Sequence, residues 1–379
     1  MIQRHFWQGL IETAWSERSV VWLSGVRRAG KTSLCQTLED VEYYDCELPR
    51  VRRMMEDPEA FLEGLGKARI VLDEIHRLQN PSELLKIASD HYSQVQVVAT
   101  GSSTLGASSR FKDTLAGRKR DVWLTPMCLE DLKDAKRPDL RHRFLHGGLP
   151  PFFLSKAVPE RDFQEWMDAF WAKDIQELFR LERRSSFQRF LEMVLSQSGG
   201  IFEATRFSAP CEVSRSTIAN YLKVLEATFV AHVIRPFSTH RPTEIVAAPK
   251  VYGFDTGFVC YYRGWQELRS DDLGFLWEHF VLNEIMARSQ SREVFYWRDK
   301  RGHEVDFILA RRRSDPQALE CKWSATGFDA SNLQAFRRQY PKGNNLVIAH
   351  DVDRPFQRKY GEISVRFESL DSHPLQGAF

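Results

Sequence analysis

The segment GVRRAGKTSL, at residues 25–34, restricts the fold of this chain more than any other stretch. A β-branched and aromatic run at 19–24 precedes it and apolar residues at helical spacing follow it, which predicts a strand, a loop and a helix in that order. In that context the pattern GxxxxGK[ST] lets successive backbone N–H groups point at phosphate oxygens. A chance match in a glycine-containing turn is the alternative, and the flanking segments argue against it. The expected nucleotide-binding residues are Gly25, Arg28, Ala29, Gly30, Lys31, Thr32 and Ser33.

A second motif supplies the acids that such a site needs. The segment ARIVLDEIH at 68–76 has the composition of a buried strand that ends in two acids. Lys31 is expected to reach the β- and γ-phosphates, the Thr32 hydroxyl to ligate Mg²⁺, and Asp73 to hold the same ion through water. Glu74 is expected to orient and polarise the attacking water. A strand that ends in a solvated acidic turn is the alternative, but the two motifs in this order predict Mg²⁺-dependent ATP hydrolysis.

These motifs, with ATGSS at 99–103, LAGR at 115–118 and HGGLPPFF at 146–153, resemble a known group. The chain looks like the AAA+-related P-loop ATPases of bacteria and archaea that are often called archaeal-type ATPases. The resemblance covers nearly the whole chain, and it implies a domain of unknown function on the C-terminal side of the ATPase. It also implies ATP and Mg²⁺ as ligands and DNA as a partner.

The resemblance further implies two residues that act on the γ-phosphate. Ser102 follows an apolar strand and is expected to be the polar sensor, with Thr100 and Ser103 as alternatives. Arg118 follows a glycine in a loop and is expected to act as an arginine finger toward the next subunit, with a solvated surface residue as the alternative. A finger supplied by another subunit implies a ring-forming homo-oligomer, for which a hexamer is one candidate form.

The middle of the chain is predicted to be a helical connector. Residues 160–199 have apolar residues at helical spacing. The resemblance implies that a small helix-turn-helix unit follows; residues 207–237 fit that expectation and end in a short hairpin, which gives a winged-helix arrangement. Ser214 is expected to cap the second helix. The functional interpretation is that this helix contacts DNA; a structural spacer or a subunit contact is the alternative. The expected DNA contacts are Arg215, Asn220 and Lys223.

The last part of the chain combines one long helix with short strands. A helix is predicted over 271–289 and strands over 292–299, 303–310 and 318–323. Glu320 and Lys322 are two residues apart in a strand, so their side chains project to the same face. Asp306 lies in an apolar strand, where a charge is costly without a partner.

This order of a helical acid, a strand aspartate and E-x-K resembles the PD-(D/E)XK nuclease fold. The resemblance gives the metal and catalytic roles to Asp306, Glu320 and Lys322, with Glu278 preferred over Glu284 as the helical acid. In such a site carboxylates hold Mg²⁺ beside the scissile phosphate, and the lysine stabilises the developing charge. The fold is also used for binding without cleavage, which is the alternative.

Composition excludes several other classes. No apolar run approaches the length of about 20 residues that a membrane span needs, and the N-terminus lacks a signal peptide's apolar centre. The six cysteines form no CxxC pair, so reduced thiols in a cytoplasmic protein are expected. The formal net charge of +2 does not by itself indicate a nucleic-acid binder. His142 and His146 are four residues apart but have no third ligand at suitable spacing, which argues against a metal site.

The prediction is an α/β protein of three parts. Residues 1–150 form a P-loop AAA+-like ATPase core, 151–245 a helical and winged-helix connector, and 246–379 a restriction-endonuclease-like α/β domain. The expected function is an ATPase that uses ATP hydrolysis to bind, move or remodel DNA. The rival is a nucleotide-dependent switch or scaffold whose C-terminal parts contact proteins, and a narrower alternative is an ATP-dependent nuclease.

Overall fold

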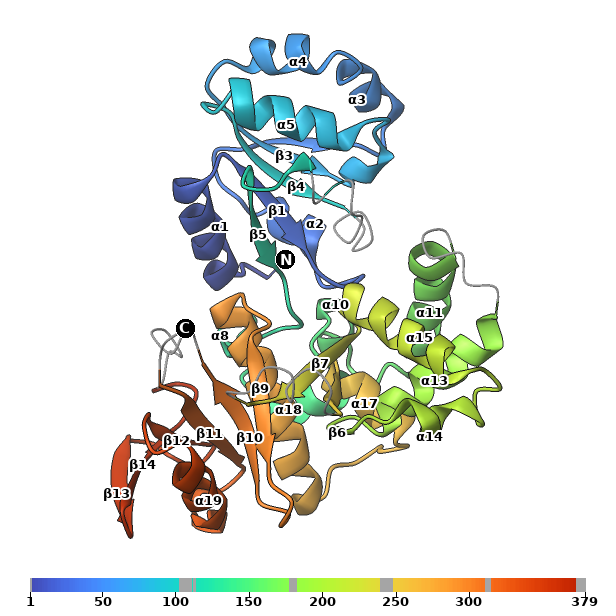
Figure 1. Ribbon diagram of the computed structural model, residues 1–379. Helices are drawn as coiled ribbons and strands as arrows, with labels where there is room; N and C mark the ends of the chain where they lie inside the picture. Colours follow the sequence, from blue (N-terminus) through green and yellow to red (C-terminus); the bar gives the residue numbers. More distant parts are fainter. Residues whose placement is uncertain are drawn as a thin grey trace.

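The computed structural model describes residues 2–101, 111, 114–176, 183–238, 248–310 and 315–372. Within these ranges the strands form two sheets, one in the N-terminal third and a longer one in the rest of the chain. Figure 1 shows the first sheet and its helices above the longer sheet. No helix of the described chain combines the length and the apolar character needed to cross a membrane.

The first sheet is parallel throughout and has helices on both faces. Its strands are β1 (Val20–Ser24), β2 (Glu42–Asp45), β3 (Arg69–Asp73), β4 (Gln96–Thr100) and β5 (Lys119–Trp123), and its helices are α1 (His5–Glu17), α2 (Lys31–Cys35), α3 (Pro49–Met54), α4 (Pro58–Leu65) and α5 (Pro81–His91). The strand order is β2-β3-β4-β1-β5, and every neighbouring pair is parallel.

Alternate residues of each strand serve the two faces of this sheet. Val21 and Leu23 belong to the same buried cluster as residues of α1 and α2, whereas Val20 and Trp22 belong to a cluster with residues of α3, α4 and α5. Because all five strands run the same way, their carboxyl ends meet at one edge. Ser24, Asp73 and Thr100 therefore end neighbouring strands on the same side of the sheet.

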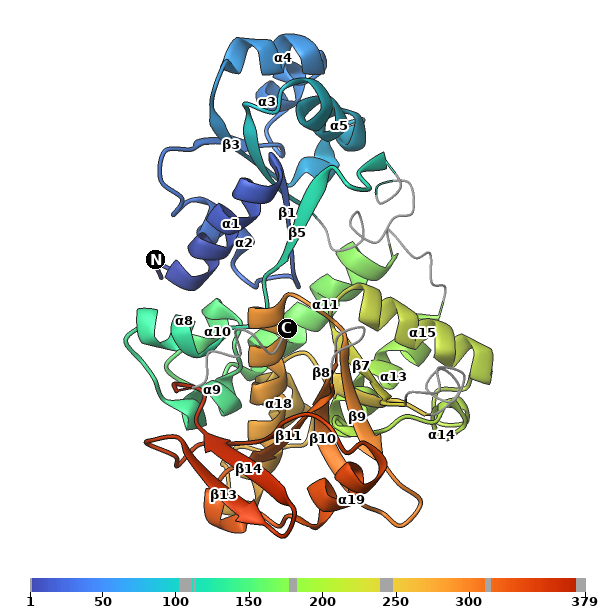
Figure 2. The same cartoon turned by 60° about the vertical axis from the view of Figure 1, so that its left-hand side comes forward.

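The middle of the chain packs helices under that edge. Its elements are α8 (Leu129–Asp134), α9 (Leu140–His146), α10 (Pro150–Phe153), α11 (Glu160–Ala169), a π-helix (Phe170–Gln176), α13 (Arg184–Ser196), β6 (Gly200–Ile201), α14 (Ala204–Ser208), α15 (Arg215–Ala227), β7 (Ala231–Pro236), β8 (Lys250–Gly253) and α17 (Thr256–Tyr262). Helices α8 and α10 lie between the first sheet and the C-terminal part in both views (Figure 1 and Figure 2). Strand β8 lies in the range expected for the last domain, yet it pairs antiparallel with both β6 and β7.

The C-terminal part completes the longer sheet. Its elements are α18 (Ser270–Ser289), β9 (Val294–Arg298), β10 (Glu304–Leu309), β11 (Gln317–Lys322), a 3-10 helix (Ala325–Gly327), α19 (Ser331–Gln339), β12 (Asn345–Ala349), β13 (Phe356–Tyr360) and β14 (Ile363–Glu368). The order is β13-β14-β12-β11-β10-β9-β7-β8-β6. The parallel pairing of β7 with β9, through Arg235 and Phe295, joins the connector strands to the C-terminal strands. Connector and C-terminal part therefore share one continuous sheet.

Candidate functional site

The loop between β1 and α2 has backbone geometry that only its glycines accept easily. Gly25 has φ 150°, and a Cβ atom there would lie 2.5 Å from the carbonyl oxygen of Leu124. Gly30 has φ 95° and precedes the first residue of α2. Both conformations lie outside the region that residues with a side chain favour. The strand, loop and helix predicted around GVRRAGKTSL are thus present, with the loop wrapped as phosphate binding requires.

Lys31 lies at the base of this loop. Its Nζ donates hydrogen bonds to the carbonyl oxygens of Gly25 at 2.9 Å and Val26 at 3.2 Å, which are bonds that a phosphate oxygen could replace. Burial lowers the pKa of Lys31, although the charges of Glu74 and Asp174 oppose that effect. The Lys31 ammonium group can exchange these carbonyl partners for a phosphate oxygen with little movement.

The two acids of the second motif face this loop from the end of β3. Asp73 is buried, with 3% of its surface exposed, and it accepts hydrogen bonds from the hydroxyls of Tyr43, at 2.5 Å, and Thr100. The backbone N–H of Glu74 donates to Thr100 Oγ1 at 3.1 Å. Thr100, which the sequence offered only as an alternative sensor, therefore connects the two acids directly.

Glu74 is held in an unusual backbone conformation beside His76. Its φ of 53° places it in the left-handed region, and its Oε2 lies 3.1 Å from His76 Nδ1. Burial alone would raise the pKa of Glu74, but the hydrogen bond with His76 and the charge of Lys31 bring it below its usual value. A carboxylate that stays ionised at neutral pH can orient and polarise a water molecule.

A cavity of about 530 Å³ joins these groups. Seven of the predicted residues line it: Gly25, Arg28, Gly30, Lys31, Thr32, Ser33 and Glu74. Apolar walls come from Ile2, from Pro150 and Pro151 at the start of α10, and from Leu154 directly after it. A polar end with a lysine and exposed hydroxyls beside an apolar end suits a molecule that carries phosphates and a flat base. Thr32, with Asp73 behind it, offers the oxygen donors that Mg²⁺ prefers.

The loop is also held from behind by an arginine that sequence patterns did not single out. Arg4, at the start of α1, is 3% exposed and donates from Nη1 to the carbonyl oxygen of Ala29 at 2.8 Å. Its Nε and Nη2 donate to the two carboxylate oxygens of Asp131 at 2.9 and 2.6 Å. Trp7 Nε1 donates to the same carboxylate at 3.1 Å. This bidentate pair fixes the loop against α1 and α8.

The connector reaches the loop as well. Arg27 Nε lies 3.0 Å from Asp174 Oδ2 in the π-helix, and the carbonyl oxygen of Arg27 accepts a hydrogen bond from Trp166 Nε1 at 2.9 Å. Trp166 is fully buried and stacks against Phe254, which follows β8. The phosphate-binding loop is therefore bonded to a segment about 140 residues further along the chain.

The other two ATPase residues expected from the resemblance are Ser102 and Arg118. Ser102, with its neighbour Ser103, lies outside the described residues. Arg118 Nε pairs with Asp90 Oδ1 at 2.7 Å on the surface. It directly precedes β5, whose first residue pairs with Val20 at the start of β1, so it lies at the sheet edge opposite the loop. Arg118 is thus directed away from its own phosphate site.

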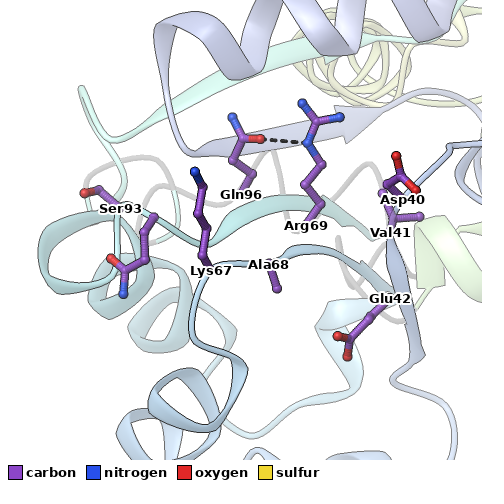
Figure 3. Close-up of a pocket in the computed structure, with 9 residues that line it drawn as sticks. Asp40, Val41, Glu42, Lys67, Ala68, Arg69, Ser93 and Gln96 are labelled. Carbon is purple, nitrogen blue, oxygen red and sulfur yellow. Dashed lines mark hydrogen bonds between the residues drawn. The ribbon is translucent and has the colours of Figure 1, made fainter.

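A larger and more open hollow of about 840 Å³ also lies at that opposite edge (Figure 3). It is lined by residues that begin β2, β3 and β4, including Glu42, Lys67 and Arg69. Arg69 Nε donates to Gln96 Oε1 at 2.9 Å within it. The two sequence motifs lie at the other end of the strands, so this hollow is separate from the predicted nucleotide site despite its size.

A second polar cluster forms on the longer sheet, and it includes all four residues preferred for a nuclease-like site. Lys322 Nζ lies 2.7 Å from Glu320 Oε2 and 3.9 Å from Asp306 Oδ2. Asp306 Oδ2 also accepts from the backbone N–H of Cys321 at 2.7 Å. Glu278 lies close enough to Asp306 to repel its charge. The helix, strand and strand order predicted these neighbours.

Three further members of the cluster carry no sequence signal of their own. Lys250, on β8, pairs with Glu304 and lies 3.6 Å from Glu278 Oε1. Tyr252, two residues on and facing the same way, donates to Glu278 Oε1 at 2.5 Å. Both belong to β8, which no sequence motif connects with Glu278, so their closeness to Glu278 depends on tertiary packing.

The charges of this cluster are balanced by lysines. Burial and the charge of Glu278 raise the pKa of Asp306, and burial and Asp306 raise the pKa of Glu320. Glu320 Oε1 is buried with no hydrogen-bond partner among the described residues. Over the same residues, no three His, Cys, Asp or Glu side chains are arranged to hold a metal ion. Lys250 and Lys322 pair with these acids, and the metal role given to Asp306, Glu320 and Glu278 stays a prediction.

The remaining candidates have structural partners. Glu284, the alternative helical acid, accepts from the backbone N–H of Leu129 at 2.5 Å and from Arg288 Nε at 3.0 Å, away from the acid cluster. The rings of His142 and His146 stack with centroids 3.7 Å apart. All six cysteines are buried free thiols.

Helix α15 is the element predicted to contact DNA. Ser214 caps it by accepting from the backbone N–H of Thr217 at 3.1 Å. Ile218 and Leu225 are buried, while the opposite face is exposed to solvent. That exposed face carries Arg215, Asn220 and Lys223.

Comparison with known families gives three matches along the chain. Residues 17–133 match a family described as an AAA domain. Residues 137–269 and 273–369 match two domains of unknown function, DUF8612 and DUF4143. The first match spans the glycine-rich loop and both acids of the second motif. The prediction of a P-loop ATPase is confirmed in this general form, and the nuclease-like character of the last part stays a prediction.

Individual relatives are distant. The uncharacterized proteins Mb2031c of Mycobacterium bovis and Rv2008c of Mycobacterium tuberculosis are each 25% identical over 338 residues, which is 86% of this chain and 75% of theirs. Among solved structures, the Walker-type ATPase PABY2304 of Pyrococcus abyssi is similar with a TM-score of 0.46 and 15% identity, over 69% of this chain and 96% of that one. That likeness is too weak for a functional conclusion. Residues 17–133 are a P-loop ATPase domain of the AAA type.

Proposed function

We propose that this protein is a Mg²⁺-dependent ATPase that couples ATP hydrolysis to the binding, translocation or remodelling of DNA. The ATPase part rests on the 530 Å³ cavity, where Lys31, Thr32 and Glu74 meet. The DNA part rests on one observation, the exposed polar and basic face of α15. Strands β6, β8 and β7 beside α14 and α15 follow the order of a winged helix, in which the second helix enters the major groove.

Removing the two basic side chains of that face is expected to weaken DNA binding. In an Arg215→Ala/Lys223→Ala double variant, affinity for a short duplex should fall about tenfold. The slope of log K against the logarithm of the salt concentration should become smaller in magnitude by about 2, because two phosphate contacts are lost. Fluorescence anisotropy over a series of salt concentrations measures both quantities. DNA-stimulated ATP hydrolysis should fall in the same variant, while the rate without DNA should not change.

The matched control is Arg358→Ala/Lys359→Ala. This pair removes the same two charges from the exposed strand β13, which lies at the far end of the longer sheet from α15 (Figure 1). Equal loss of affinity in both double variants would mean that binding follows net charge and not α15. Duplex and branched DNA that neither bind nor change ATP turnover would favour the rival function, a nucleotide-dependent switch that contacts proteins.

The proposal includes a ring-forming homo-oligomer in which Arg118 acts on a neighbouring subunit. Arg118 lies at the sheet edge away from its own loop, and its charge is held on the surface by Asp90. An arginine so placed can contribute to hydrolysis only in trans. Sedimentation velocity with ATP and Mg²⁺ tests this assembly. A protein that stays monomeric at all concentrations would contradict the role of Arg118 as an arginine finger.

DNA cleavage is the further alternative, and its support is the convergence of Glu278, Asp306, Glu320 and Lys322. Cleavage of that type needs a divalent metal among the acids, whereas Lys250 and Lys322 already pair with them. We therefore expect supercoiled DNA to stay intact when the protein is incubated with ATP and Mg²⁺ or Mn²⁺, as followed on agarose gels. A nicked product that disappears in Asp306→Ala and in Lys322→Ala, with ATP turnover intact, would establish the nuclease instead.

A further inference from the structure

Asp174 places a carboxylate in a cavity that is otherwise suited to phosphates. It lines the 530 Å³ cavity together with Lys31 and Glu74, although it belongs to the connector. Its side chain is buried, and its Oδ2 lies 3.0 Å from Arg27 Nε in the phosphate-binding loop. Burial raises the pKa of Asp174, while Arg27 and Lys31 oppose that rise. The position of this acid needs an explanation, because an anion near a phosphate site weakens phosphate binding.

The local backbone brings Asp174 into the cavity. Helix α11 continues into a π-helix over Phe170–Gln176, and π-helical turns inside helices are frequent at functional sites. The same helical segment is anchored by Trp166, which donates to the carbonyl oxygen of Arg27 and stacks on Phe170. One segment of the connector thus contacts both the backbone and the side chain of Arg27.

Arg27 cannot pair fully with Asp174 and with a phosphate at the same time. Its guanidinium is 29% exposed and lines the cavity, so it is within reach of a nucleotide bound at Lys31. A triphosphate brings more negative charge to this end than a diphosphate does. The extra phosphate would repel Asp174 and attract Arg27, and the carboxylate would then be left buried without its partner.

We propose that Asp174 determines the nucleotide preference of this site by opposing the triphosphate and holding Arg27 until ATP displaces it. The inference rests on the proposed nucleotide site and adds a residue to it. Because Asp174 and Trp166 lie on one helical segment, the exchange of Arg27 from Asp174 to the phosphate changes a contact between the ATPase domain and the connector. The presence of the γ-phosphate is thereby communicated to the connector.

An Asp174→Asn variant tests this directly. Asparagine keeps the shape and removes the charge, so affinity for ATP should rise about tenfold, while affinity for ADP should rise less. The ratio of the two dissociation constants, measured with fluorescent ATP and ADP analogues in Mg²⁺, is the quantity that decides. Arg27→Ala should shift the ratio the opposite way, since it removes the cation that the triphosphate recruits.

Asp168→Asn is the matched control. Asp168 lies six residues earlier, on α11, is exposed, and pairs with Arg184 at 2.7 Å outside the cavity. The ratio of the ATP and ADP dissociation constants of this variant should equal that of the wild type. If Asp174→Asn does not fold, as judged by thermal unfolding, Asp174→Ser takes its place in the same assay.

The outcomes separate this inference from the nucleotide site itself. If a folded Asp174 variant has the wild-type ratio of ATP and ADP dissociation constants, and Lys31→Ala loses nucleotide binding, the inference is overturned and the nucleotide site stands. Wild-type protein that binds neither nucleotide overturns both. A shifted ratio in the Asp174 variant, with none in Asp168→Asn, supports the assignment.

Discussion

Replacing Glu74 with glutamine is expected to lower the rate of ATP hydrolysis by about 10²–10⁴-fold while ATP still binds. Glutamine has nearly the same shape, so the cavity should keep its form, but an amide cannot accept a proton from the attacking water. The folded protein holds the pKa of Glu74 below its usual value, so the wild-type carboxylate is charged at neutral pH. Phosphate release under saturating Mg-ATP measures the rate, and fluorescent ATP measures binding.

Glu47→Gln supplies the control within the same cavity. Glu47 also lines it, but its side chain is 57% exposed and lies 3.5 Å from Arg77. It is not at the end of a buried strand, so its loss should change the rate less than twofold. If Glu47→Gln abolished turnover and Glu74→Gln did not, the role given to Glu74 would be wrong. A wild-type rate in Glu74→Gln would likewise contradict the role given to Glu74.

The parts of this site that sequence reasoning found are those in which short-range spacing dictates geometry. Gly25 and Gly30 are five residues apart because the loop must turn twice around a phosphate, and their φ values are those that the pattern requires. Asp73 and Glu74 end a strand whose burial is visible as an apolar run. In each case a local pattern implies the local backbone, and a parallel sheet then brings strand ends together without further information.

The parts that sequence reasoning missed depend on residues far apart in the chain. Arg4 pairs with Asp131 across 127 positions, and Arg27 pairs with Asp174 across 147. Single charged residues in helices have no periodicity that distinguishes a buried partner from a solvated one. The π-helix has no pattern of its own either, and it sets the direction of Asp174. Lys250 follows the same rule, since β8 pairs with two strands that precede it.

Replacing Arg4 with alanine is expected to destabilise the N-terminal domain by about 3–5 kcal/mol, the usual cost of leaving one partner of a buried ion pair alone. The exposed fractions of Arg4 and Asp131 are 3% and 0%, so water cannot replace the lost guanidinium. The Ala29 carbonyl would lose its partner too, so ATP binding should weaken along with stability. Urea unfolding gives the first quantity and fluorescent ATP the second.

The neighbouring residue and the pH dependence make this prediction specific. His5, directly after Arg4, pairs with Asp134 with 69% of its side chain exposed, so His5→Ala should cost less than about 1 kcal/mol of stability.

Burial by itself would raise the pKa of Asp131, but Arg4 holds that pKa below its usual value. A carboxyl with a lowered folded-state pKa stabilises the protein above its unfolded pKa of about 3.9, and this contribution is lost as the pH falls through the folded value. The Asp131→Asn variant should therefore be less stable than the wild type at neutral pH, and its stability should fall less than that of the wild type when the pH is lowered. An acid-unfolding curve of Asp131→Asn equal to that of the wild type would show that the pair does not hold the loop.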